Sequence, residues 1–137
     1  MSAFSWPVRV YWEDTDAAGV VYYASYLRYL ERARTEWLRS LGYSQRSLAV
    51  EPGIVFAVAS LTIDYRLPAK LDDALTVTCE PCRSGRASLT FPQHVYRASA
   101  GAAGQELVVE ASVRVVCLDA RNLRPQRLPE FLALALQ

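Results

Sequence analysis

The stretch WEDTDAAGVVYYASYLRYLERARTEWLRSL, residues 12–41, decides the fold of this chain. Its second half has the spacing of an amphipathic helix, because apolar side chains recur at positions 23, 26, 27, 30, 33, 37, 38 and 41. Gly42 then predicts the C-terminal end of that helix. Before the helix, the acidic run 13–16 and the loop 17–19 bring carboxylates close to a helix N-terminus, whose free N–H groups and partial positive charge suit a polarised carbonyl group.

The composition indicates one folded globular domain over residues 1–137. Hydrophobic residues make up 52% of the chain and charged residues 21%, and this length can bury most of its apolar surface. A net charge of +1 gives no reason to expect a nucleic-acid partner. The N-terminus lacks the pattern of a signal peptide, no apolar run is long enough to span a membrane, and the three cysteines fit reduced thiols, so we expect a soluble, cytoplasmic protein.

Outside the long helix the sequence predicts mainly strands. Val8, Val10 and Trp12 alternate with polar neighbours and predict a first strand with one face toward a core. Apolar alternation predicts four more strands, over 54–67, 72–80, 87–95 and 107–117, with a turn at residues 84–85. One strand, a long helix and four closely connected strands describe an α+β fold in which an antiparallel sheet packs on one principal helix.

The acidic run Glu13-Asp14-Thr15-Asp16 leaves two interpretations open. It could be a solvated turn, which is the more common role of such a sequence. If the strand geometry persists, Asp14 and Asp16 share one face while Glu13 points to the other. A carboxylate of ordinary pKa is ionised at neutral pH, so on that reading it could attack an acyl carbon or activate water to do so.

Other candidates for chemistry are weaker. The pattern Cys79-Glu-Pro-Cys82 lies toward the end of a strand rather than in a redox context, and zinc would need two more ligands. A Ser-His-Asp triad could only use His94, and no GxSxG segment supplies its serine. The arginines near the turn at 84–85 are either solvated or suited to ligand phosphates. We therefore expect no metal and no bound cofactor.

Three segments carry a resemblance to a known family. They are VRVYWEDTDAAGVVYYASYLRYLERARTEWLRSLG (8–42), LTIDYRLPAKLDD (61–73) and VRVVCLDARNLRPQRLP (113–129). Together they make the chain similar to the hotdog-fold acyl-CoA thioesterases of the 4-hydroxybenzoyl-CoA thioesterase class, and most of all to the Tol-Pal-associated branch. The resemblance implies a five-stranded antiparallel sheet wrapped around one long central helix. It also implies subunits that pair into homodimers or homotetramers, with the active site between them.

The resemblance assigns roles to individual residues. The catalytic aspartate of the family corresponds to Asp16, as nucleophile or general base, and the backbone N–H of Tyr23 would polarise the thioester carbonyl. Many members have histidine where this chain has Tyr23, and the Tol-Pal branch usually has tyrosine where it has Trp12. These departures concern substrate and rate more than the class of reaction.

Coenzyme A would be held by basic residues near the turn at 84–85. Arg86 matches such a position, with Ser88 close to it and Arg83 as a further candidate. The other residues expected to line the substrate site are Trp12, Gly19, Val21, Tyr22 and Tyr26.

The expected function is hydrolysis of an acyl-CoA thioester to a carboxylate and free coenzyme A. A hydratase or dehydratase of the same fold would need a histidine beside an acid, and His94 lies in the wrong element. The other alternative is a non-catalytic module that binds acyl-CoA or acyl-carrier protein in association with the cell-envelope machinery. Acyl-CoA binding without turnover would distinguish this alternative.

Overall fold

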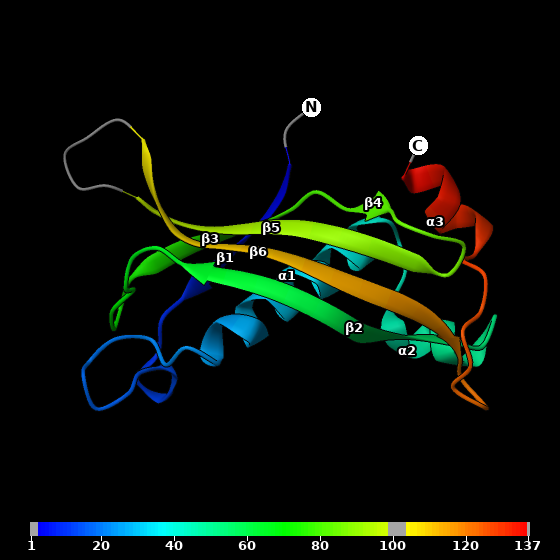
Figure 1. Ribbon diagram of the computed structural model, residues 1–137, viewed down its shortest axis with the longest axis horizontal. Coiled ribbons are helices and arrows are strands. Elements are labelled where there is room, and N and C mark those ends of the chain that lie inside the picture. The colour runs from blue at the N-terminus through cyan, green and yellow to red at the C-terminus, as the bar shows by residue number, and fades with distance from the viewer. Residues whose placement is uncertain (1–2, 99–103, 137) are drawn as a thin grey trace.

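Figure 1 shows the computed structural model of the protein, which describes residues 3–98 and 104–136. One curved sheet covers the long helix α1 (Ser25–Ser40), while the short helices α2 (Gln45–Val50) and α3 (Glu130–Ala135) lie toward one end. The strands are β1 (Phe4–Arg9), β2 (Ile54–Tyr65), β3 (Ala74–Cys79), β4 (Cys82–Arg83), β5 (Ser88–Ala98) and β6 (Gln105–Asp119). This arrangement confirms the predicted α+β class.

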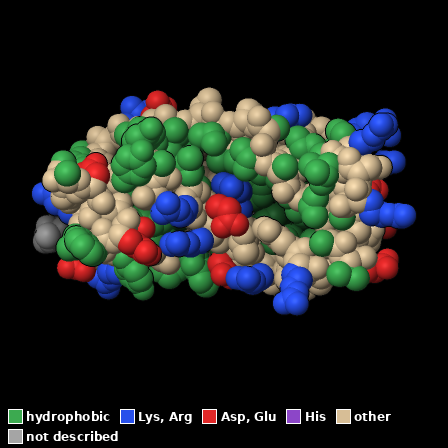
Figure 2. Space-filling view, turned by 90° about the horizontal axis from the view of Figure 1, so that it is seen from below, with side chains coloured by type: hydrophobic (Ala, Val, Ile, Leu, Met, Phe, Trp, Pro, Cys, Tyr) green, Lys and Arg blue, Asp and Glu red, His purple; other side chains and the backbone are tan. Residues whose placement is uncertain are grey.

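The strands pair in the order β1-β3-β5-β6-β2, and every pairing is antiparallel. This path is the predicted five-stranded sheet; the two-residue strand β4 pairs with β5 beside it. The long strand β2 therefore lies at an edge, with a row of backbone groups available to another strand. Val58 is 47% exposed and Leu61 38% exposed on that edge. Figure 2 shows the molecule from below, where hydrophobic side chains reach the surface between charged ones.

Helix α1 packs against the sheet through one face. Its buried residues recur every three or four positions along one face, and comprise Ser25, Tyr26, Tyr29, Leu30, Ala33, Trp37 and Leu38. Most of the predicted face is confirmed, but Leu27, which the spacing places on it, is 38% exposed, and Tyr29, which the spacing does not include, is fully buried. The helix begins two residues later than predicted, so Tyr23 lies in the turn before it. Gly42, with a φ of +94°, follows the helix end as expected. None of the helices in the described parts of the chain is long and apolar enough to cross a membrane.

The N-terminal strand ends earlier than the sequence predicts. Strand β1 stops at Arg9, and residues Trp12–Asp14 form a 3-10 turn in which Trp12 is 80% exposed instead of facing the core. Such a turn rotates the chain by about 120° per residue, so alternate residues do not share a face. The strand geometry therefore does not persist, and the condition under which Asp14 and Asp16 would share a face is not met: Asp14 is buried and Asp16 is exposed.

Candidate active site

Asp14 holds together the loop that precedes α1. Its Oδ2 accepts a hydrogen bond of 2.9 Å from the N–H of Tyr11, and its backbone carbonyl accepts one of 2.8 Å from the N–H of Tyr22. Asp14 as a whole is only 4% exposed. One buried residue thus ties the start of the loop to its end, and fixes where the intervening residues lie.

Asp16 lies at the tip of this loop in a closed turn. Its N–H donates to the carbonyl of Val20, and its carbonyl accepts the N–H of Gly19, whose φ of +79° favours glycine. The Oδ1 of Asp16 accepts a hydrogen bond of 2.8 Å from the N–H of Ala18. This bond orients the carboxylate while the side chain stays exposed to solvent and to ligands.

The start of α1 presents a free N–H group. The carbonyl of Tyr22 accepts a hydrogen bond of 2.8 Å from the N–H of Ser25, which turns the N–H of the same peptide unit, that of Tyr23, away from the helix. No acceptor for the Tyr23 N–H lies within residues 3–98 or 104–136. The helix adds its partial positive charge here, so a developing oxyanion would be stabilised at this point.

A surface hollow brings the carboxylate and the helix start together. Asp16 and Tyr23 line it, and so do two residues predicted to bind substrate, Val21 and Tyr26. Gly19 closes the turn beside Asp16, and the ring of Tyr22 lies against that of Tyr23 with 4.8 Å between their centroids. The hollow is completed by residues that the sequence alone did not single out as functional, namely Val20, Tyr65, Arg66, Leu67 and Pro68. Four of these lie in the segment 61–73, one of the three that carry the resemblance.

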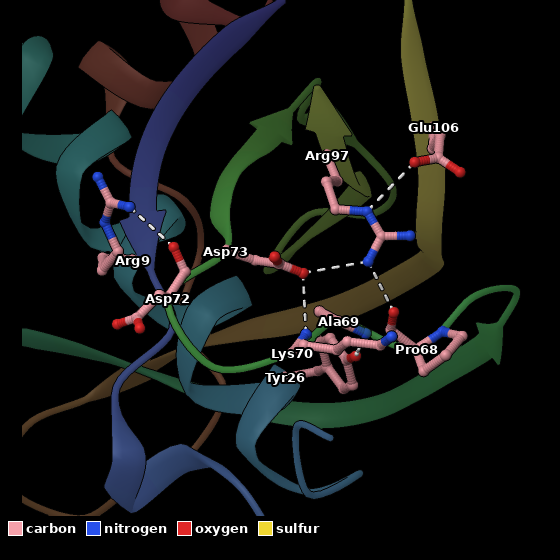
Figure 3. A network of polar contacts seen from close by, with 9 residues as sticks. All are labelled: Arg9, Tyr26, Pro68, Ala69, Lys70, Asp72, Asp73, Arg97 and Glu106. Carbon is pink, nitrogen blue, oxygen red and sulfur yellow. Dashed lines mark hydrogen bonds and ion pairs between the residues drawn. The ribbon is translucent and has the colours of Figure 1, made fainter. Parts of the chain in front are cut away.

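The wall of the hollow is braced by a polar network (Figure 3). Arg97 on β5 donates to the Pro68 carbonyl at 2.8 Å and forms an ion pair of 3.1 Å with Asp73. On the other side, the Tyr26 hydroxyl of α1 accepts a hydrogen bond of 3.2 Å from the N–H of Ala69. The loop that follows β2, which forms part of the wall, is thereby fixed between the sheet and the helix.

The residues expected to bind coenzyme A lie elsewhere. In Figure 1, β4 and the start of β5 lie near α3, at one end of the molecule. The loop at residues 12–24 lies toward the opposite end. Arg83 donates to the carbonyl of Gly85, and the buried Ser88 shares a hydrogen bond of 3.0 Å with Ser84. Arg86 is exposed beside them. One chain alone does not bring these residues, or the exposed Trp12, into the hollow beside Asp16.

The cysteines are unpaired and lie outside the hollow. Cys79 and Cys117 are buried, while Cys82 is exposed. Burial raises the pKa of Cys79 to about 12 and that of Cys117 to about 11, so both remain protonated thiols. Within the described residues, no three His, Cys, Asp or Glu side chains are grouped to hold a metal ion.

Comparison with known proteins gives the family. Residues 10–136 match the model of the Thioesterase-like superfamily. The chain belongs to this superfamily. Among the relatives of this thioesterase-superfamily chain, Acyl-CoA thioester hydrolase YbgC of Escherichia coli is 46% identical over 93% of this chain and 90% of its own length. Acyl-CoA thioesterase YbgC of Haemophilus influenzae is 43% identical over 94% of this chain and 90% of its own length.

Solved structures confirm the hotdog fold of this thioesterase-superfamily chain. A mutant 4-hydroxybenzoyl-CoA thioesterase in complex with 4-hydroxybenzoyl-CoA superposes with a TM-score of 0.90 at 26% identity, covering 98% of this chain and 99% of that chain. The 4-hydroxybenzoyl-CoA thioesterase of Pseudomonas gives a TM-score of 0.86 at 28% identity, covering 96% of this chain and 98% of that chain. The predicted resemblance to this class is therefore confirmed at the level of the superfamily and the fold.

Proposed function

We propose that this protein hydrolyses acyl-CoA to a carboxylate and free coenzyme A, with Asp16 as its catalytic carboxylate. The relatives bear out the predicted class of enzyme, an acyl-CoA thioester hydrolase. The observation that supports the assignment of Asp16 is that its carboxylate and the free N–H end of α1 line the same hollow. A thioester carbonyl with its oxygen at the Tyr23 N–H would bring its carbon within reach of this acid.

Two routes are open to the carboxylate. As a nucleophile, Asp16 would add to the thioester carbon, expel the coenzyme A thiolate and leave an anhydride, which water then hydrolyses. As a general base, it would take a proton from a water molecule that attacks the same carbon, and the thiolate would leave from the tetrahedral intermediate. In both routes the negative charge on the carbonyl oxygen would be stabilised by the Tyr23 N–H.

The hollow favours an acyl group with an apolar body. Val21, Tyr26 and the ring of Tyr65 form its apolar lining, while Arg66 adds a cation. Tyr23, which also lines the hollow, is 62% exposed, and Tyr22, whose ring lies against it, is 45% exposed. Aromatic walls of this kind can contact either an aliphatic chain or an aromatic ring.

We propose a homodimer or homotetramer in which a second subunit completes the coenzyme A site. Arg86, Ser88 and Arg83 would then approach the substrate from a partner, since none of them lines the hollow of their own chain and β4 and the start of β5 lie away from the loop at residues 12–24. The exposed edge of β2, with Val58 and Leu61, is suited to pairing with a copy of itself. Light scattering should give at least twice the chain mass, and Val58→Asp with Leu61→Asp should reduce it; a monomeric wild type would contradict this proposal.

Thiol release from acyl-CoAs tests the proposed activity. A panel of short-chain, long-chain and aromatic acyl-CoAs should give turnover and identify the preferred acyl group. Binding of acyl-CoA with no thiol release from any member would instead favour the non-catalytic binding module. The cytoplasmic location and the association with the Tol-Pal envelope machinery remain predictions, which fractionation and co-purification would test.

A further inference from the structure

We propose that Tyr65 is a positioning residue for hydrolysis, and that its hydroxyl fixes the backbone at Tyr23 so that the Tyr23 N–H meets the oxyanion. This inference rests on the proposed function and extends it. Tyr65 is the last residue of β2 and stands 42 positions beyond Tyr23 in the sequence. It would act through a backbone carbonyl and need not contact the substrate.

The contact between the two tyrosines is direct. The Tyr65 hydroxyl donates a hydrogen bond of 2.9 Å to the carbonyl of Tyr23. The two rings meet edge to face, with centroids 6.4 Å apart, and the Tyr65 ring also lies 5.6 Å from that of Tyr26. Burial, followed by the neighbouring Tyr23, raises the pKa of Tyr65, so its hydroxyl stays protonated and donates at neutral pH.

This bond completes the fixation of the Tyr23 backbone. The peptide before Tyr23 is held because the Tyr22 carbonyl accepts the N–H of Ser25. The peptide after Tyr23 is held because its carbonyl accepts the Tyr65 hydroxyl. Because the peptide planes on both sides of Tyr23 are held, neither φ nor ψ of Tyr23 can turn freely. The direction of its N–H is therefore set.

Strand β2 supports the backbone before this helix from outside, through the Tyr23 carbonyl. Helices commonly begin with Ser, Thr, Asp or Asn, whose side chain caps the first turn, but α1 has Ala24 at this position and no capping side chain. The Tyr65 hydroxyl does not replace such a cap, because it donates to the Tyr23 carbonyl and accepts from no helix N–H group, but it does hold the backbone just before the helix. It does so without occupying an N–H group, which leaves the Tyr23 donor available to the substrate.

The expected effect falls on turnover more than on binding. A donor aimed at the oxyanion acts where charge develops in the transition state, so its loss lowers kcat and changes KM little. Tyr65→Phe keeps the ring and removes the hydroxyl. Because one neutral hydrogen bond is lost, kcat should fall by about fivefold to tenfold, while KM stays within about twofold. The affinity for a non-hydrolysable alkyl-CoA thioether, which lacks the thioester carbonyl, should be unchanged.

Tyr43→Phe provides the matched control. Its ring stacks on Phe131 with centroids 3.7 Å apart, and Tyr43 does not line the hollow. This variant should keep the wild-type kcat. Tyr65→Leu, which also loses the ring, should lose more kcat than Tyr65→Phe, and unfolding midpoints measured for all three variants would separate this effect from a loss of folded protein.

The outcomes separate the two proposals. If wild type turns over, Asp16→Asn is inactive and Tyr65→Phe keeps the wild-type kcat, the role of Tyr65 is overturned and the proposed function stands. A Tyr65→Phe variant that weakens thioether binding as much as it lowers kcat would also overturn it, because Tyr65 would then support binding in general. Absence of turnover in the wild type overturns the proposed function, and the role of Tyr65 with it.

Discussion

Asp14 and Asp16 stand two residues apart and have opposite surroundings. The Asp14 carboxylate is buried and accepts the N–H of Tyr11, whereas Asp16 is exposed and lines the hollow at the start of α1. The 3-10 turn at residues 12–14 produces this difference, because it turns one carboxylate inward and delivers the other to the loop tip. One aspartate therefore supports the loop, and the other is accessible at its tip, as the proposed catalytic role requires.

Asp14→Ala should destabilise the protein. It removes a buried, charge-assisted hydrogen bond to the Tyr11 N–H, and the free energy of unfolding should fall by about 2 kcal/mol. Glu13→Ala, an exposed neighbour in the same turn, is the control and should change stability by less than about 0.5 kcal/mol. Urea unfolding measures both values. Equal stability of the two variants would show that Asp14 does not anchor the loop.

Gln93→Leu should destabilise the protein from the centre of the sheet. Gln93 is fully buried; its amide nitrogen donates to the carbonyls of Leu30 and Thr78, and its oxygen accepts from Arg34. Leucine has a similar size but leaves these partners unsatisfied, so we expect a loss of about 2–4 kcal/mol. Chemical denaturation would measure it, with the exposed Gln105→Leu as control. A loss below about 1 kcal/mol would contradict this role.

The three thiols should differ in reactivity. Cys82 is exposed and should react with a thiol reagent in the native protein, whereas Cys79 and Cys117 should react only after unfolding. Mass spectrometry of the labelled protein would count the modified sites, and Cys82→Ser should take up no label when native. Rapid labelling of more than one site in the folded wild type would be the contrary result.

Stability should also fall at alkaline pH. Burial raises the pKa of Cys79 from 9.0 to about 12, so the folded state holds this proton more tightly than the unfolded state. The resulting stabilisation is complete below the unfolded pKa and is lost as pH rises from 9.0 toward about 12. Unfolding curves of the wild type and Cys79→Ala across this range test the assignment. The free energy of unfolding of Cys79→Ala should depend less on pH than that of the wild type. An identical pH dependence of the two proteins would contradict the assignment to Cys79.

Patterns with a regular period predicted the fold well. The 3.6-residue spacing predicted α1, Gly42 predicted its end, and alternation predicted the buried face of β6 from Val109 to Cys117. Local turn chemistry was harder to predict. Nothing in the alternation of residues 8–13 indicated a 3-10 turn that exposes Trp12, because the preference for that turn comes from the buried carboxylate of Asp14.

The candidate site could be predicted only in part. Asp16 and Tyr23 are close in sequence, so their shared hollow followed from the loop and the helix start. Tyr65 reaches the site through the register of β2 across the sheet, which no local pattern contains. In the proposed oligomer, the placement of Arg83, Arg86 and Ser88 relative to Asp16 would depend on how the subunits associate, which the sequence of one chain does not specify.

The turnover of Asp16→Asn tests the central claim most directly. Asparagine keeps an oxygen that can accept the Ala18 N–H, so the turn and the unfolding midpoint should be preserved while the negative charge is lost. With the best acyl-CoA of the panel, kcat should fall by about 100-fold or more, whereas Glu13→Gln should retain wild-type turnover. A folded Asp16→Asn protein that releases thiol at the wild-type rate would contradict the assignment of Asp16 as the catalytic carboxylate.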